Sequence, residues 1–238
     1  MIDSPDQNRE ATQRLNQFLA LSLGISRRQA DNLIEQGKVT INERVAPLGA
    51  RFTDGDTIKC SGQPLTAQQF KTIAFHKPVG YVCSRRQQGD VPTIYELLPQ
   101  PLHNLKPVGR LDKDSSGIIL LTNDGDLAFR MTHPSFSKQK RYLVTLDNSL
   151  EPLHRQMISD FGVDLPDGKS RLILSRQIDG DESRWIVEMS EGRNRQIRRT
   201  FSALGYTVTK LHRTNFGDYS LGDIPAGKYV DTDISQGA

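Results

Sequence analysis

Two amphipathic helices are predicted in succession near the N-terminus. Apolar residues recur at helical spacing over residues 14–24, and Gly24 is suited to end the first helix. In the second helix Ser26 and Gln29 form a capping box, and Gly37 supplies the stop. The buried faces of these helices are predicted to consist of Leu15, Phe18, Leu19 and Leu23 in the first and Ala30, Leu33 and Ile34 in the second.

Short stretches of alternating polarity follow the helices and predict small strands. In "KVTIN", for example, Val39 and Ile41 point inward. Two helices and several small strands make a compact module over residues 13–62. Residues 63–70 are polar and aperiodic, so they are predicted to be a linker, and the polar residues 1–12 are predicted to be a mobile tail.

Strand patterns outnumber helix patterns in the rest of the chain, and many are joined by short turns. This favours an α+β domain on a largely antiparallel sheet over a doubly wound fold. Neither G-x-G-x-x-G after a strand nor G-x-x-x-x-G-K-[ST] occurs, so no dinucleotide or nucleoside triphosphate site is indicated. Strands are predicted at residues 71–77, 80–84, 117–122, 141–146, 170–176, 184–190 and 206–213, and helices at 126–133, 151–161 and 193–205.

Composition excludes several classes of protein. No stretch approaches the ~20 apolar residues of a membrane helix, and the first residues lack the apolar centre of a signal peptide. We therefore expect the protein to be located in the cytoplasm. The two cysteines predict reduced, structural thiols. The five histidines do not fall at metal-ligand spacing with each other or with the cysteines, so no metal is expected.

The distribution of charge points to a polyanion as the partner. The segment 191–213 carries six cationic residues and one acid, a local excess of +5 that exceeds the +3 of the whole chain. Arg27 and Arg28 stand in the first turn of the second predicted helix, where cations oppose the helix dipole. Contact with RNA phosphates would favour them there, and ordinary solvated arginines are the alternative.

The stretch "GRLDKDSSG", residues 109–117, places two carboxylates in a polar loop directly before a buried strand. Loops held by a rigid sheet are a common place for catalytic residues. The alternative is an Asx-type turn, in which Asp112 or Asp114 merely accepts hydrogen bonds from nearby backbone N–H groups.

The longer stretch "GRLDKDSSGIILLTNDGDLAFRMTHP" strongly resembles the pseudouridine synthases of the RsuA, RluB, RluE and RluF group, with a complete match to R-L-D-x-x-[ST]-x-G. The resemblance implies that Asp112 is the sole essential catalytic carboxylate. It also implies that Arg110, Lys113 and Ser116 shape the loop or contact backbone, and we place Arg110 with the substrate-binding residues.

Two further segments resemble the same family. "KQKRYLVTL" matches K-x-Y through Lys140 and Tyr142, which implies a tyrosine stacked on the target base; an ordinary strand tyrosine is the alternative. "EGRNRQIRRTFSALG" matches E-G-x-N-R-Q-[IV]-R-R, although Thr200 stands where methionine is usual. Leu211 resembles the apolar residue that packs against tyrosine and base, with ordinary core as the alternative, and Arg213 completes the pattern.

A helical wheel separates the arginines of the third motif. At about 100° per residue, Arg198 sits at the edge of the apolar face, whereas Arg195 and Arg199 point roughly opposite, toward water or RNA. An arginine at the core boundary needs a carboxylate partner, and Asp112 is the predicted one. This ion pair would keep Asp112 ionised in a cleft closed over a flipped base.

Residues 14–62, above all "SRRQADNLIEQGKVTIN", resemble the S4-type RNA-binding domain, in which a helix-turn-helix pair carries basic residues across a nucleic-acid backbone. The resemblance implies that Arg27, Arg28 and Lys38 contact RNA. Taken together, the two resemblances imply an α+β protein: a small S4-like domain, then a catalytic domain over residues 71–238 on a mostly antiparallel mixed sheet.

The function implied is isomerisation of a uridine to pseudouridine in ribosomal RNA. The oligomeric state stays open, and a monomer is the expectation. No atoms are gained or lost, so no cofactor is expected. The target uridine must leave its stack, and contacts with RNA phosphates can offset the free-energy cost of this unstacking. A non-catalytic RNA-binding or ribosome-assembly factor is the alternative, and a hydrolase with Asp112 and Asp114 as paired acids is weaker. The expected catalytic residues are Asp112, Tyr142 and Arg198, and the substrate-binding residues are Arg110, Lys140, Arg195, Arg199, Leu211 and Arg213.

Overall fold

The computed structural model describes residues 12–66, 69–85 and 89–232. The chain divides into two compact units, one up to Phe70 and one from Lys71, and each has its own hydrophobic core. The predicted N-terminal tail, apart from Thr12, lies outside the described residues. Among the described residues, no helix combines the length and apolar character needed to cross a membrane.

The N-terminal unit contains the two predicted helices, α1 (Leu15–Leu23) and α2 (Arg27–Glu35). Gly24 ends α1 in the left-handed conformation, with a φ of 67°. The capping box of Ser26 and Gln29 starts α2, with both of its hydrogen bonds present. Both helix boundaries therefore follow from local sequence signals.

The strands of this unit form a small antiparallel sheet of order β3-β2-β5-β6, and β1 pairs with β4. The predicted linker begins too early, because Gln63 and Pro64 pair with Cys60 and Lys59. Leu65 packs on the core of the unit and holds this strand in place. The strands are β1 (Gln13–Arg14), β2 (Val39–Ile41), β3 (Arg44–Val45), β4 (Arg51–Phe52), β5 (Ile58–Cys60) and β6 (Gln63–Pro64).

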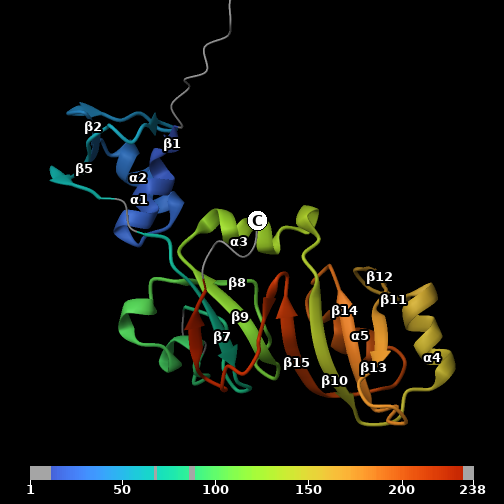
Figure 1. Cartoon of the computed structure of the whole chain (residues 1–238). Helices are drawn as coiled ribbons and strands as arrows, with labels where there is room; N and C mark the ends of the chain where they lie inside the picture. The colour runs from blue at the N-terminus through green and yellow to red at the C-terminus, as the bar shows by residue number, and fades with distance from the viewer. Residues whose placement is uncertain (1–11, 67–68, 86–88, 233–238) are drawn as a thin grey trace, which may run out of the picture. The chain divides into compact units, whose positions relative to one another are not determined.

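The C-terminal unit is built on one large sheet of order β13-β14-β10-β15-β9-β7-β17, with β8 beside β9 and β16 beside β15 (Figure 1). Among its described ladders all are antiparallel except β9 with β15, so the predicted α+β class is confirmed. The strands are β7 (Thr72–Lys77), β8 (Lys106–Val108), β9 (Ser116–Thr122), β10 (Lys140–Leu146), β13 (Ile173–Arg176), β14 (Arg184–Met189), β15 (Val208–Phe216), β16 (Tyr219–Ser220) and β17 (Tyr229–Asp231).

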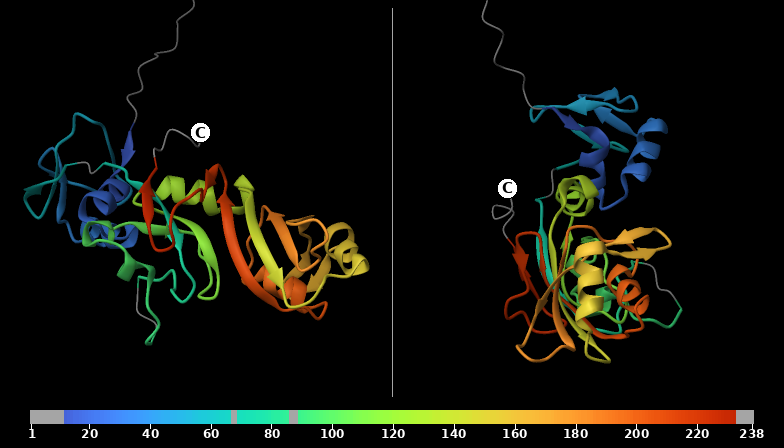
Figure 2. Two further views of the ribbon diagram at one scale, coloured as in Figure 1. Left: turned by 60° about the horizontal axis from the view of Figure 1, so that its bottom comes forward. Right: turned by 90° about the vertical axis from the view of Figure 1, so that its right-hand side faces the viewer.

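Both faces of this sheet are buried. Alternate residues of β9 enter two different clusters: Ile119 packs with the core that includes Phe201, and Ile118 packs with the core that includes Leu127. Helix α5 (Gln196–Ser202) therefore covers one face and α3 (Gly125–Thr132) the other (Figures 1 and 2). Burial on both faces explains why β9 reads as an uninterrupted apolar run.

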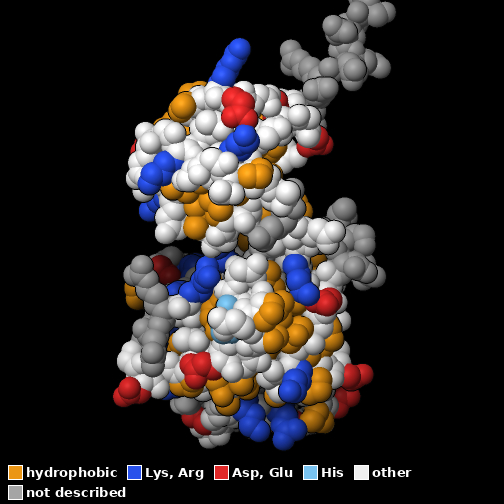
Figure 3. Space-filling model, turned by 90° about the vertical axis from the view of Figure 1, so that its left-hand side faces the viewer, with side chains coloured by type: hydrophobic (Ala, Val, Ile, Leu, Met, Phe, Trp, Pro, Cys, Tyr) orange, Lys and Arg blue, Asp and Glu red, His pale blue; other side chains and the backbone are white. Residues whose placement is uncertain are grey.

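The remaining elements lie around the sheet. Helix α4 and the hairpin of β11 and β12 lie together at the end of the sheet formed by β13 and β14 (Figures 1 and 2). Hydrophobic side chains reach the surface in small groups between charged ones (Figure 3), which is ordinary for folded proteins. These elements are η1 (Ile94–Leu97), η2 (Gln100–Leu102), η3 (Pro134–Phe136), α4 (Pro152–Gln156), its π-helical continuation η4 (Met157–Phe161), β11 (Val163–Leu165) and β12 (Gly168–Ser170).

One predicted strand does not form. In residues 80–84 a single bridge joins Val82 to Thr93, and no ladder follows. The thiol of Cys83 instead donates to the carbonyl of Leu111 and accepts from its backbone N–H, both at 3.5 Å. The segment therefore supports the loop that follows β8 rather than the sheet.

Gly117 makes the close approach of β9 to β15 possible. Its φ is 115°, and a Cβ there would lie 2.1 Å from the carbonyl oxygen of Arg213. Backbone on both strands cannot yield to such a contact. We expect Gly117→Ala to lower the free energy of unfolding by about 3–5 kcal/mol, measured by urea denaturation of the full chain.

Gly180→Ala is the matched control for this prediction. Gly180 also has a positive φ, of 84°, but no atom lies within 4 Å of the added Cβ. Backbone strain alone should then lower the free energy of unfolding by about 1–2 kcal/mol. Equal losses in the two variants would show that the contact with Arg213 does not matter.

Candidate active site

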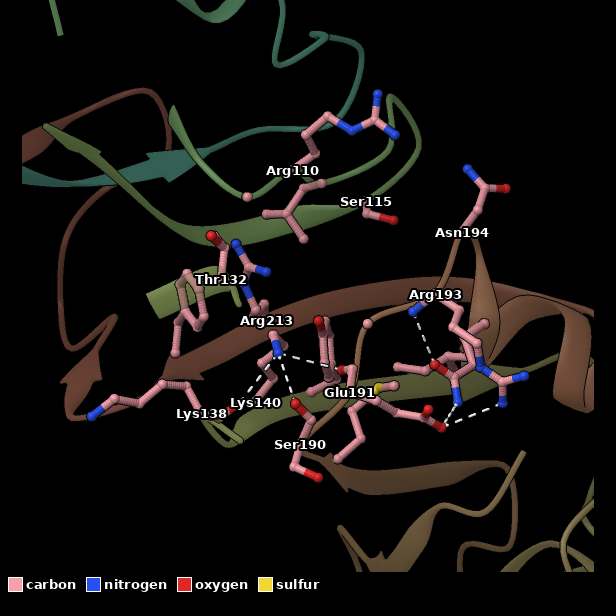
Figure 4. A pocket seen from close by; sticks show the side chains of 18 of the residues that line it. Arg110, Ser115, Thr132, Lys138, Lys140, Ser190, Glu191, Arg193, Asn194 and Arg213 are labelled. Carbon is pink, nitrogen blue, oxygen red and sulfur yellow. Dashed lines mark hydrogen bonds and ion pairs between the residues drawn. The ribbon is translucent and has the colours of Figure 1, made fainter. Parts of the chain in front are cut away.

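A cavity of about 580 Å³ lies within the C-terminal unit, bordered by the loop after β8, the end of α3, β10, β15 and the segment before α5 (Figure 4). Its volume falls in the range of small-ligand sites. Arg198 and Arg199 are not among its lining residues. The predicted site residues that do line it are Arg110, Asp112, Lys140, Tyr142, Arg195, Leu211 and Arg213.

Asp112 belongs to a tight turn at the edge of the cavity. Its carbonyl accepts from the backbone N–H of Ser115 at 3.1 Å, and about a third of its side chain, 32%, is exposed. The backbone N–H of Gly80 donates to the carbonyl of Lys113 at 2.7 Å. The loop is therefore fixed from the segment that follows β7, while the carboxylate of Asp112 stays accessible.

Lys77 stabilises the same loop by a hydrogen bond to its backbone. The sequence did not predict this role. The Lys77 side chain is fully buried, and its ammonium donates to the carbonyls of Ser115 at 2.6 Å and Pro78 at 2.9 Å. Burial lowers the pKa of Lys77 to about 8, although the nearby Cys83, Asp112 and Asp114 oppose the shift. A lysine at the end of a buried strand, directly before proline, was the available signal.

Arg195 is the cation beside Asp112. Its Nη1 lies 3.5 Å from Oδ2 of Asp112, and its guanidinium also forks onto both carboxylate oxygens of Asp114, at 3.2 and 3.3 Å. Burial raises the pKa of Asp114, but the hydrogen bonds from Arg195 and the charge of Arg198 outweigh it and hold that pKa below its ordinary value. One arginine thus bridges the two carboxylates of the loop.

The predicted ion pair between Asp112 and Arg198 is wrong. The Nε of Arg198 lies 3.4 Å from Oδ2 of Asp114, and its Nη2 donates to the carbonyl of Asp114 at 2.9 Å. Its Nη1 donates to the carbonyl of Val208. The helical wheel correctly placed Arg198 at the edge of the core, since only 12% of its side chain is exposed. Arg198 stabilises the loop through Asp114 and does not contact Asp112.

The wheel failed for Arg195 because this residue lies outside the helix. Helix α5 begins at Gln196, and Arg195 precedes it in the left-handed conformation, with a φ of 46°. The side-chain oxygen of Gln196 accepts from the backbone N–H of Arg193 at 3.1 Å, which closes the turn before the helix. The side chain of Arg195 therefore points toward Asp112 rather than away from it.

Arg199 forms an ion pair outside the cavity lining. Its guanidinium forks onto Asp167 at 3.0 and 2.7 Å, and Arg193 also pairs with Asp167 at 3.2 Å. Asp167 stands in the turn between β11 and β12. Arg199 thus ties this hairpin to α5, and its predicted orientation toward water or RNA is replaced by an intramolecular contact.

Tyr142 and Arg213 face each other across neighbouring strands, β10 and β15. Tyr142 and Leu211 are each only 8% exposed, and both line the cavity. The Nε of Arg213 donates to the carbonyl of Ile118 at 2.9 Å, and its guanidinium lies 4.8 Å from the ring centroid of Phe216. Its Nη2 is buried without a hydrogen-bond partner among the described residues, and Arg213 as a residue lines the cavity.

Lys140 is held at the same wall of the cavity. Its ammonium donates to the carbonyls of Lys138 and Ser190, each at 3.2 Å, and of Glu191 at 3.3 Å (Figure 4). Burial and the neighbouring Arg213 lower its pKa. Arg110 extends away from this group at the rim (Figure 4). The cavity therefore combines a carboxylate, an aromatic ring and several cations.

The predicted RNA contacts of the N-terminal unit lie on its surface. Arg27 and Arg28 are exposed in the first turn of α2, which contains no acidic residue, and Lys38 is exposed between α2 and β2. Cations in this position oppose the helix dipole, so helix stability does not account for them.

Comparison with known proteins identifies the family. A family model described as RNA pseudouridylate synthase matches residues 71–203, and an S4 domain model matches residues 13–58. The chain belongs to the RNA pseudouridylate synthase family. Ribosomal small subunit pseudouridine synthase A of Pasteurella multocida is 37% identical over 222 residues, which covers 91% of this chain and 94% of that protein.

Two further similarities agree with this membership. Dual-specificity RNA pseudouridine synthase RluF of Salmonella typhi is 36% identical over 227 residues, 93% of this chain and 76% of that protein. A crystal structure of a pseudouridylate synthase matches with a TM-score of 0.66 and 34% identity, and covers 93% of this chain and 96% of that one. The predicted family, the S4 domain and the enzyme class are confirmed, and the non-catalytic alternative is disfavoured.

Proposed function

We propose that this pseudouridine synthase modifies a uridine of ribosomal RNA and that Asp112 is its catalytic carboxylate. The observation that carries the proposal is the convergence of Asp112, Tyr142 and Arg213 on one cavity, with Arg195 beside the carboxylate. A relative named as a ribosomal small subunit pseudouridine synthase and one named as a dual-specificity RNA pseudouridine synthase match along nearly the whole chain, which supports the choice of substrate.

The reaction breaks the bond between the base nitrogen and the ribose, turns the base, and rejoins it through carbon. That carbon loses a proton and the released nitrogen gains one. Atoms and redox state balance, so the chemistry requires no cofactor. Asp112 starts the reaction by attack on sugar or base or by assisting an elimination. The guanidinium of Arg195 lies 3.5 Å from the carboxylate of Asp112 and orients it for such a step, and Arg198 positions the loop through Asp114.

The other walls of the cavity suit a uracil nucleotide. The ring of Tyr142 offers an aromatic face for the base, with Leu211 packed beside it. Arg213 lines the same cavity and brings a guanidinium group that suits a uracil carbonyl or a phosphate oxygen. Arg110, which also lines the cavity, is the proposed contact to the RNA backbone.

The RNA must present the target uridine outside its stack, because the cavity cannot admit a base that remains paired in a helix. The exposed Arg27, Arg28 and Lys38 of the N-terminal unit contribute phosphate contacts that offset the unstacking. We expect the enzyme to act in the cytoplasm as a monomer.

Chemical mapping of pseudouridine in ribosomal RNA, from cells with and without the gene, tests the proposal. We expect one specific pseudouridine to disappear in the deletion strain and to return when the wild-type chain is supplied. If every site in ribosomal RNA persists in the deletion strain, the proposal fails for this substrate, and transfer RNA becomes the next candidate.

A further inference from the structure

Three aromatic rings contact one another on the surface of the C-terminal unit, at the end of α3 and in η3. The ring centroid of Phe129 lies 4.7 Å from that of His133 and 5.8 Å from that of Phe136. The centroids of His133 and Phe136 are 6.4 Å apart. Phe129 is 52% exposed and Phe136 is 44% exposed, so neither ring contributes fully to a core.

Packing of α3 does not require these rings. The helix buries Leu127 and Met131 against the sheet, whereas Phe129 lies between them in sequence and faces outward. Small groups of exposed hydrophobic side chains occur on this molecule (Figure 3), and by themselves they do not indicate a binding partner. A cluster of exposed rings in mutual contact instead indicates a binding surface.

Local contacts order the turn that carries the cluster. Pro134 opens η3, and the ring of His133 caps it, because the backbone N–H of Ser135 donates to Nδ1 at 3.3 Å. Ser135 Oγ lies 2.7 Å from the same nitrogen. A preformed surface of this kind loses little conformational entropy on binding.

The cluster is continuous with the active-site cavity. His133 and Pro134 line the cavity, together with Thr132 and Lys138 from the same segment. Phe129 and Phe136 contact His133 but do not line the cavity, so the aromatic surface begins at the rim and extends outward. Arg130, the residue after Phe129, is exposed on α3 and adds a cation to this helix.

We propose that Phe129, His133 and Phe136 form a stacking platform for one unpaired base of the RNA, next to the target uridine. The proposal rests on the proposed function, because the target uridine defines which base is the neighbour. A flipped uridine leaves adjacent bases without a stacking partner, and aromatic side chains bind such bases with little sequence preference. If the RNA strand leaves the cavity over His133, the nucleotide next to the target uridine reaches this platform.

Fluorescence of 2-aminopurine tests the platform in the full chain. The probe is a short RNA with one central uridine among adenosines, in which one adenosine at a time is replaced by 2-aminopurine. We expect the wild-type chain to quench 2-aminopurine at one position beside the uridine. The double variant Phe129→Ala with Phe136→Ala should lose this quenching and bind the RNA about tenfold more weakly.

Phe161→Ala is the matched control, because Phe161 is 63% exposed on the same unit and does not line the cavity. It should bind as the wild type does. An RNA with an abasic site at the quenched position should bind the wild type about tenfold more weakly, and the double variant should lose no more than about twofold on this RNA.

Three outcomes would overturn the platform: unchanged RNA affinity in the double variant, an equal loss on intact and abasic RNA, or a change in self-association of the protein instead of RNA binding. Binding requires no turnover, so the two proposals fail separately. If the wild type quenches 2-aminopurine but the deletion strain keeps every pseudouridine, the proposed function fails and the base-binding surface stands.

Discussion

Asp112→Asn is expected to abolish pseudouridine formation, with kcat lowered by about 10⁴-fold or more, while RNA affinity stays within about twofold of the wild type. Asparagine keeps the shape of the side chain, and the hydrogen bond from Ser115 to the backbone carbonyl of residue 112 is unaffected. The substitution removes the negative charge with which Asp112 would attack the sugar or base or assist an elimination. Single-turnover assays on RNA, with mass spectrometry of the product nucleosides, measure the effect, and filter binding measures the affinity.

Asp114→Asn is the matched control for this substitution. It makes the same change two residues away in the same loop, where the carboxylate pairs with Arg195 and Arg198. Because Asp114 positions the loop and is not proposed to react, we expect kcat to fall by only about tenfold. Comparable losses in both variants would favour a pair of acids over a single catalytic carboxylate. Full activity in Asp112→Asn would refute the catalytic role.

Local signals account for the elements that sequence analysis predicted correctly. The cap of α2 depends on Ser26 and Gln29, three residues apart, and the apolar run of β9 requires only that both faces be covered. The motif around Asp112 likewise lies within one loop. Each of these signals is complete within a few neighbouring residues.

The errors occurred where distant contacts decide the structure. Residues 80–84 alternate like a strand, but Cys83 bonds to Leu111 and the ladder does not form. Gln63 and Pro64 look like linker, yet they complete a sheet edge because β5 is available to pair with them. Lys77 acquires its role from the carbonyl of Ser115, far along the sequence. No periodicity of the chain encodes these partners.

The partner of Asp112 could not be derived for the same reason. A helical wheel assumes that each residue is helical, and Arg195 adopts a positive φ in a turn closed by Gln196. The third motif predicted arginines near the loop. Two of them, Arg195 and Arg198, lie close enough to pair with its carboxylates. Only the three-dimensional arrangement shows that Arg195 bridges both, whereas Arg198 contacts Asp114 alone.

Arg195→Gln is expected to lower kcat about 100-fold with little change in KM, because it removes the cation 3.5 Å from Asp112. Arg199→Gln, the same change outside the cavity lining, should leave kcat within about twofold. Arg198→Gln should chiefly lower the free energy of unfolding, by about 1–3 kcal/mol, since the carbonyls of Val208 and Asp114 lose their donors while Asp114 keeps Arg195. Steady-state kinetics and urea denaturation separate these effects. A folded Arg198→Gln variant without activity, beside an active Arg195→Gln variant, would show that Arg198 is the cation on which Asp112 depends.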